Sequence, residues 1–322
     1  MTETQSKPRP WMIAAWPGMG SVASIAALYL VRELNMTEGE ELPPGGHFDV
    51  SDVEVRQGLV APVRLPRGRF FQWINPGAGR DLVVFMAEAQ PSYACLSYAE
   101  KLLDEAQLKG VERVVTFASL ACGLHPSEHP KVSGVATDAV ALDELRRAEV
   151  GPIADGQIGG MNGLLLGAAA ARGMAGVGLL AEIPFFAMRV ANPKAARAAL
   201  SVFSVLAGVD VSLDALNRQA AAFDKAMADA MERMRLEAEA NEPEEVDVDG
   251  EGELPESARP AASSEAKLPA AEDPAALARI EELFEIASRD LTHAVRLKQE
   301  LDRQGVFGKY EERFLDLFRR AN

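Results

Sequence analysis

The feature that most constrains the fold is a series of short apolar runs that alternate with helical segments. Runs of strand length occur at residues 12–16, 82–87, 113–117 and 176–183. Amphipathic or alanine-rich stretches of helical length follow them, as at residues 21–34 and 93–109. Strands that alternate with helices form a mainly parallel sheet with helices on both faces. The sequence therefore predicts an α/β three-layer sandwich, with its core domain over residues 12–211.

The segments between these runs complete the expected domain. Further helices are predicted at residues 139–148, 162–172 and 193–206, and a short strand at 135–137. Residues 36–47 are rich in Gly, Pro and Glu and are expected to form a loop. Residues 48–75 alternate in polarity and predict two to four short antiparallel strands. Ser21 is expected to cap the helix that follows it.

The last third of the chain carries two helical segments with apolar residues at a spacing of three and four. They are residues 212–241 and 274–321, and their matching periods favour an antiparallel helical hairpin. The alternative is that each apolar seam packs on the α/β body. Residues 237–273 contain 13 acidic and two basic residues and few apolar ones. This composition predicts a disordered acidic linker between the two helical segments.

Charge and cysteine usage narrow the function classes. The net charge is −15, of which residues 237–273 contribute −11. A chain this acidic is a poor candidate for nucleic-acid binding or for an anionic membrane surface. Two cysteines and a polar N-terminus without an apolar signal segment favour a reducing compartment, so we expect a cytoplasmic protein. The most apolar stretch, residues 159–186, is interrupted by Asn, Arg and Glu and does not predict a membrane span.

Candidate binding residues gather where the predicted strands end. Glu88 and Glu182 each follow a predicted parallel strand, at the sheet edge where open α/β sheets bind ligands. Two carboxylates there could act as acid and base or hold a ribose or a metal. Alternatively, they cap neighbouring helices, pair with arginines or, for Glu182, anchor the 159–162 loop. Gln90, Ser119 and Asn162 are predicted to line the same edge.

A glycine turn lies between the first predicted strand and the first helix. Its candidate residues are Gly18, Gly20 and Ser21, whose backbone amides and helix dipole suit an anion. The alternative is a tight turn that needs only flexible backbone. The chain lacks both the phosphate-loop pattern and the complete dinucleotide pattern at this turn. We therefore predict no cofactor and no catalytic residue.

One metal motif occurs in the chain. Residues 125–129 read H-x-x-E-H, which binds zinc when it lies on a regular helix. Pro126 and Pro130 bracket the segment and disfavour a helix. We expect a solvated loop here and predict no metal site.

Three sequence blocks, taken in order, resemble a known family. They are Trp16-Pro17-Gly18-Met19-Gly20, then Glu88-Ala89-Gln90-Pro91, then the series Gly159–Leu166, Glu182-Ile183-Pro184 and Asn192–Arg197. This order resembles the second proteasome-assembly-chaperone family over about residues 12–216. The resemblance implies a three-layer fold related to purine nucleoside phosphorylases and a role in proteasome assembly. It also implies, for some prokaryotic members, docking through a C-terminal tail of a hydrophobic residue, Tyr and any residue, a pattern that residues 318–322 lack.

Three functions follow from the residues and the resemblance. The first is a non-catalytic binding or assembly protein with a protein partner, acting as a homo-oligomer. The second is an enzyme or binding protein for a nucleotide-like small molecule on a nucleoside-phosphorylase-like scaffold. The third is a structural protein whose helical hairpin docks a partner. A deep polar pocket at the strand edge would favour the second, and a shallow edge with an exposed apolar stripe on the helical hairpin would favour the binding of a protein partner.

We predict that the acidic linker is dispensable for stability. Residues 237–273 cannot bury enough apolar area to offset the entropy of ordering them. Replacing them with a short Gly/Ser linker should leave the melting temperature unchanged in calorimetry. A fall of more than about 5 °C, on the order of 1 kcal/mol, would contradict this prediction.

Overall fold

A computed structural model describes residues 7–240 and 274–289, together with Leu297, Lys298, Glu300, Leu301, Tyr310, Arg313 and Phe314. The chain divides into two compact units, Met1–Glu244 and Glu245–Asn322. Most of the predicted acidic linker, residues 241–273, lies outside the described residues.

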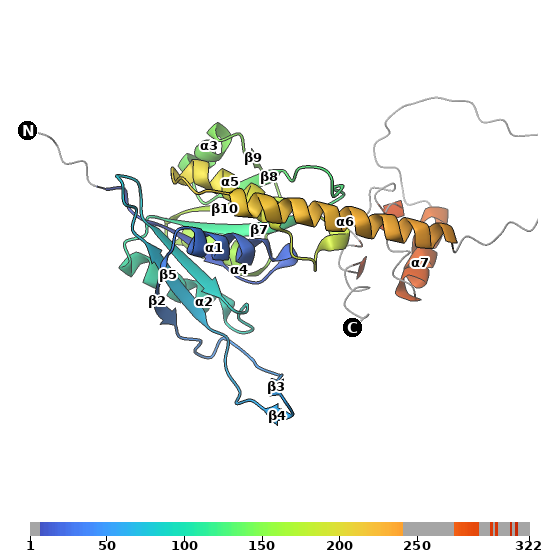
Figure 1. Cartoon of the computed structure of the whole chain (residues 1–322), viewed down its shortest axis with the longest axis horizontal. Helices are drawn as coiled ribbons and strands as arrows, with labels where there is room; N and C mark the ends of the chain where they lie inside the picture. Colours follow the sequence, from blue (N-terminus) through green and yellow to red (C-terminus); the bar gives the residue numbers. More distant parts are fainter. Residues whose placement is uncertain are drawn as a thin grey trace, which may run out of the picture. The chain divides into compact units, whose positions relative to one another are not determined.

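Four parallel strands form the centre of the first unit (Figure 1). They are β6 (Leu82–Ala87), β1 (Trp11–Ala15), β7 (Arg113–Cys122) and β10 (Ala175–Pro184), in that spatial order. Every residue of β1 is buried. A strand buried on both faces reads as a continuous apolar run, which is why sequence analysis finds the central strands readily.

Antiparallel strands flank this centre on both sides. On one side lie β5 (Gly68–Trp73) and, at the edge, β2 (Thr37–Leu42); on the other lie β8 (Val132–Ala136) and β9 (Gly151–Pro152). The pairs β5–β6, β2–β5 and β8–β10 are antiparallel, whereas β8 and β9 run parallel. The eight-stranded sheet is mixed, with its parallel strands in the middle, and the α/β fold class is confirmed.

The prediction of a loop at residues 36–47 is wrong, because six of these residues form β2. Its exposed glutamates pair with arginines of the neighbouring strand β5, as Arg69 does with Glu38 at 2.8 Å and with Glu41 at 3.1 Å. Charged residues are depleted in strands but suit an exposed sheet edge. The glutamate-rich composition suggested a loop because these cross-strand partners are distant in sequence.

Helices cover both faces of the sheet. α1 (Val22–Glu33), α3 (Ala139–Arg147) and α5 (Pro193–Ala207) pack in one apolar cluster with Ile13, Val115 and Leu179. α2 (Cys95–Leu108) and α4 (Gly160–Ala171) pack on the other face in a cluster with Met12, Val83 and Val114. The alternating residues of β6, β1 and β7 thus enter opposite clusters, and the predicted three layers are present.

A small hairpin, β3 (Val55–Arg56) and β4 (Leu59–Val60), projects from the body of the first unit (Figure 1). Its two-residue turn, Gln57-Gly58, has φ values of 50° and 81°. Two consecutive positive φ values at a two-residue loop are typical of a type I′ turn, which matches the twist of the paired strands. Together, β3, β4 and β5 confirm the antiparallel strands predicted for residues 48–75.

The long helix α6 (Asp214–Ala240) packs on the α/β body through α5. Its buried seam consists of Leu216, Ala220, Phe223 and Met227. The buried ammonium of Lys194 on α5 lies 2.8 Å from an oxygen of Asp224 on α6 and donates to the Pro126 carbonyl at 2.7 Å. The apolar seam of α6 therefore packs on the α/β body, which was the alternative to a helical hairpin. Pairing of α6 with the C-terminal helices stays a prediction.

In the second unit, α7 (Pro274–Arg289) begins at the predicted Asp273-Pro274 start. Ile280, Phe284 and Ala287 of its predicted seam are buried in a cluster that also contains Leu297, Leu301 and Phe314 of the same unit. Arg313 donates two hydrogen bonds of 2.6 Å to the Glu281 carboxylate.

A polar cluster around Trp11 lies at the edge of the sheet where the central parallel strands begin. The guanidinium groups of Arg80 and Arg113 lie 4.2 and 4.4 Å from the ring centre of Trp11. The indole N–H donates to Glu112 at 3.0 Å, and Arg80 donates to the same carboxylate oxygen at 2.6 Å. Partial burial raises the pKa of Glu112, but the hydrogen bonds from Arg80 and Trp11 and the nearby arginine charges outweigh it and leave this pKa lowered.

We predict that Glu112→Gln lowers stability in a pH-dependent way. A carboxyl whose pKa is lower in the folded state stabilises the protein above its unfolded pKa and loses that contribution as pH falls through the folded pKa. The difference in free energy of unfolding between wild type and Glu112→Gln should therefore be full at pH 7 and vanish well below pH 4.5. Because the group is partly exposed, the difference should not exceed about 1 kcal/mol.

Urea unfolding at pH 7 and pH 3 measures this difference. Glu100→Gln, on an exposed position of α2, is the control for the loss of one carboxylate. An equal destabilisation of Glu112→Gln at both pH values would contradict the prediction.

Candidate functional site

Three loops converge at the C-terminal edge of the parallel strands, as the sequence predicts. Gln90, after β6, donates from its amide nitrogen to the Pro17 carbonyl at 2.9 Å. Its amide oxygen accepts from the Met161 N–H at the start of α4, at 3.1 Å. Gly160 has a φ of 71°, which favours glycine, and a Cβ there would displace the Gln90 amide, since it would begin 2.8 Å from this oxygen. Gln90 thus ties the loop after β1 to the start of α4.

Ser119 of β7 reaches the glycine turn. Its hydroxyl donates to the carbonyl of Met19 at 2.7 Å. Ser119 therefore fastens the end of β7 to the loop that follows β1, and the two candidate residues Gln90 and Ser119 hold neighbouring carbonyls of that loop.

The glycine turn is held by backbone hydrogen bonds. Gly20 has a φ of 61°, its N–H donates to Met188 O at 2.6 Å, and its carbonyl accepts from Asn192 N–H at 2.8 Å. The N–H of Ser21 donates to Gly18 O at 3.0 Å. An anion at this turn would have to compete with backbone carbonyls for the amides of Gly20 and Ser21.

The cap expected from Ser21 is wrong. Ser21 occupies the position before α1, but its φ is 51° and its side chain makes no capping hydrogen bond. A capping side chain acts from extended backbone. Since the turn docks on the segment before α5, its backbone is held in a left-handed conformation instead.

Glu88 is engaged by arginines, the alternative that its sequence position left open. Arg64 donates to it at 2.5 Å, and the backbone N–H of Arg67 donates to the same oxygen at 3.0 Å. Partial burial raises the pKa of Glu88, but the hydrogen bonds from Arg64 and Arg67 and their charges dominate and lower it. The carboxylate is therefore a charged anchor at the base of the hairpin.

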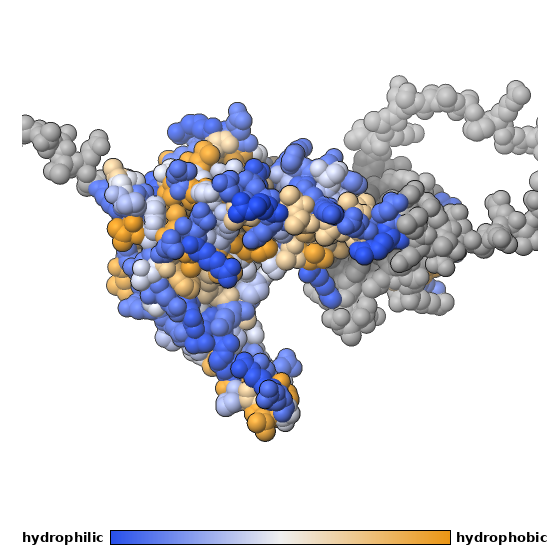
Figure 2. All heavy atoms as spheres, in the orientation of Figure 1, coloured by the Kyte–Doolittle hydropathy of each residue, from blue (hydrophilic) through white to orange (hydrophobic). Residues whose placement is uncertain are grey.

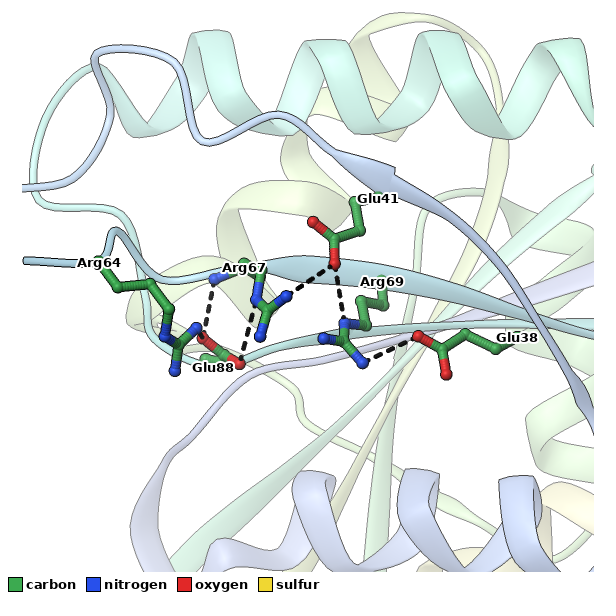
Figure 3. Close-up of polar contacts among 6 residues, drawn as sticks. All are labelled: Glu38, Glu41, Arg64, Arg67, Arg69 and Glu88. Atoms are coloured by element: carbon green, nitrogen blue, oxygen red, sulfur yellow. Dashed lines mark hydrogen bonds and ion pairs between the residues drawn. The ribbon is translucent and has the colours of Figure 1, made fainter. Parts of the chain in front are cut away.

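The arginine contacts of Glu88 continue into a ladder of charges along the sheet edge (Figure 3). Arg67 also lies 3.3 Å from Glu41, which in turn accepts from Arg69. The ladder consists of Glu38, Glu41, Arg64, Arg67, Arg69 and Glu88. The sequence offered no signal for it, because its members come from three separate segments.

Glu182 anchors the chain at Lys131, before β8, and not residues 159–162, the loop that the sequence analysis named. Its carboxylate accepts from the Lys131 N–H at 2.9 Å, and its own N–H donates to the Lys131 carbonyl at 3.0 Å. These bonds hold the chain that enters β8, not the 159–162 loop, because β8 pairs with β10 along the edge that carries Glu182. Asn162, in the first turn of α4, has a buried side-chain oxygen without a hydrogen-bond partner among the described residues.

An open cleft lies beside the start of α4. Its volume is about 500 Å³, and we name it the α4 cleft. The lining is mostly apolar and comprises Gln90, Pro91, Cys95, Ile158, Gly160, Met161, Gly163, Leu164 and Gly167. Sequence reasoning missed it, although glycines at positions 160, 163 and 167 lie on one face of a helix. A Cβ at Gly167 would meet nothing within 4 Å, whereas Gly163 packs against the backbone of Ile158.

The H-x-x-E-H segment forms a turn, as expected from its prolines. The Glu128 carboxylate accepts from the backbone N–H of His125 at 3.0 Å, and His125 Nδ1 lies 2.7 Å from the Ser127 hydroxyl. In the described part of the chain, no group of three or more His, Cys, Asp or Glu residues is placed to hold a metal. None of the described helices is both long and apolar enough to cross a membrane.

We predict that Gly20→Val is destabilising by about 1–3 kcal/mol, because a β-branched residue is strained at positive φ. Its Cβ would also lie 3.4 Å from Asn192. Gly18→Val is the matched control, since Gly18 is extended and a Cβ there meets nothing within 4 Å. Urea unfolding of the two variants checks this, and equal stabilities would show that the turn has no special backbone requirement.

The sequence of this chain is similar to those of known proteins. The model of the PAC2 family matches residues 12–231. An uncharacterized protein of Methanocaldococcus jannaschii is 24% identical over 226 residues, which cover 70% of this chain and 86% of that protein.

Solved structures share the fold. PbaB of Pyrococcus furiosus, an archaeal proteasome activator, is 26% identical with a TM-score of 0.60, over 71% of this chain and 96% of that one. A PAC2 family protein of Streptomyces avermitilis is 28% identical with a TM-score of 0.60, over 68% and 95%. A proteasome-assembly chaperone homologue of Mycobacterium tuberculosis is 22% identical, over 68% and 94%, with a TM-score of 0.60, and shows the fold alone. Because the family model spans well over half of its length, this chain belongs to the PAC2 family.

Proposed function

We propose that this chain is a non-catalytic binding protein of the cytoplasm that assists the assembly of other proteins and acts as a homo-oligomer. Membership of the PAC2 family supports the proposal, as does the likeness to a protein described as a proteasome activator. The partner is a protein, and a proteasome subunit is the first candidate.

One observation carries the proposal. Four polar side chains at the strand edge are occupied by contacts within the chain: Gln90 and Ser119 hold carbonyls, Glu182 holds the Lys131 backbone, and Glu88 holds arginines. A catalytic group needs polar atoms that face a substrate. Side chains engaged in this way stabilise loops and present a rigid surface, which suits the binding of another protein.

A second candidate function is the binding of a nucleotide-like small molecule. The unpartnered oxygen of Asn162 favours it, because this residue lies between the cleft-lining residues Met161 and Gly163. The cleft is open and mainly apolar, however, and it offers few polar groups to orient a ligand. Calorimetric titration with adenosine and inosine tests it, and we expect no binding at millimolar concentration.

Mass and partner measurements test the proposed function. Light scattering after size exclusion should give a multiple of the 34.6 kDa chain mass. Tagged protein, cross-linked in native cytosol, should recover a protein partner whose own assembly, followed by native mass spectrometry, is faster when the chain is present. Recovery with an unrelated tagged protein is the control for non-specific capture. A monomer that leaves the partner's assembly unchanged would overturn the proposal.

A further inference from the structure

We draw no further inference here: the strongest candidate, the exposed apolar surface of the projecting β3–β4 hairpin (Figure 2), carries none, because Val55 and Val60 lie on one face of the hairpin and Leu59 on the other, and nothing in the structure shows what covers either face.

Discussion

The structure depends on the burial of β1 on both faces. All five residues from Trp11 to Ala15 are at most 3% exposed, and the strand lies between two parallel neighbours. A strand without an exposed face must be covered by helices above and below, and parallel neighbours must be joined by crossovers. The three layers follow from these two requirements, and so does the gathering of the loops after β1, β6 and β7 at one edge.

That edge explains why a binding function suits this fold better than catalysis. Side chains tie the loops there together in addition to their backbone hydrogen bonds: Gln90 contacts Pro17 and Met161, and Ser119 contacts Met19. Buried or half-buried polar groups are costly unless they are paired. Side chains used in this way hold loops together.

Much of the fold was predictable from the sequence. The position of the candidate site residues at the strand ends was also predictable, but the residues that they contact were not. The strand at residues 82–87 was located correctly because an apolar run of that length needs no knowledge of its neighbours. β2 was missed because its glutamates are stabilised by Arg69, which is distant in sequence. Glu88 and Glu182 lie at strand ends as predicted, but Arg64 and Lys131 decide what they do. Hydrophobic periodicity in the sequence indicates which residues of one strand or helix are buried. Ion pairs depend on which strands and helices lie next to one another, and the sequence pattern does not show this.

The sequence by itself determined the fold class, the order of the central strands and of the helices that follow them, and the family resemblance, because these follow from local hydrophobic periodicity and from motif order. Only the tertiary structure decided that Gly20 takes a positive φ, that Glu88 pairs with Arg64, and that a cleft lies beside the start of α4. The physical reason is the range of the interactions. Burial of a strand is settled within a few residues, but a hydrogen bond, an ion pair or a cavity exists only once segments far apart in the chain are brought together.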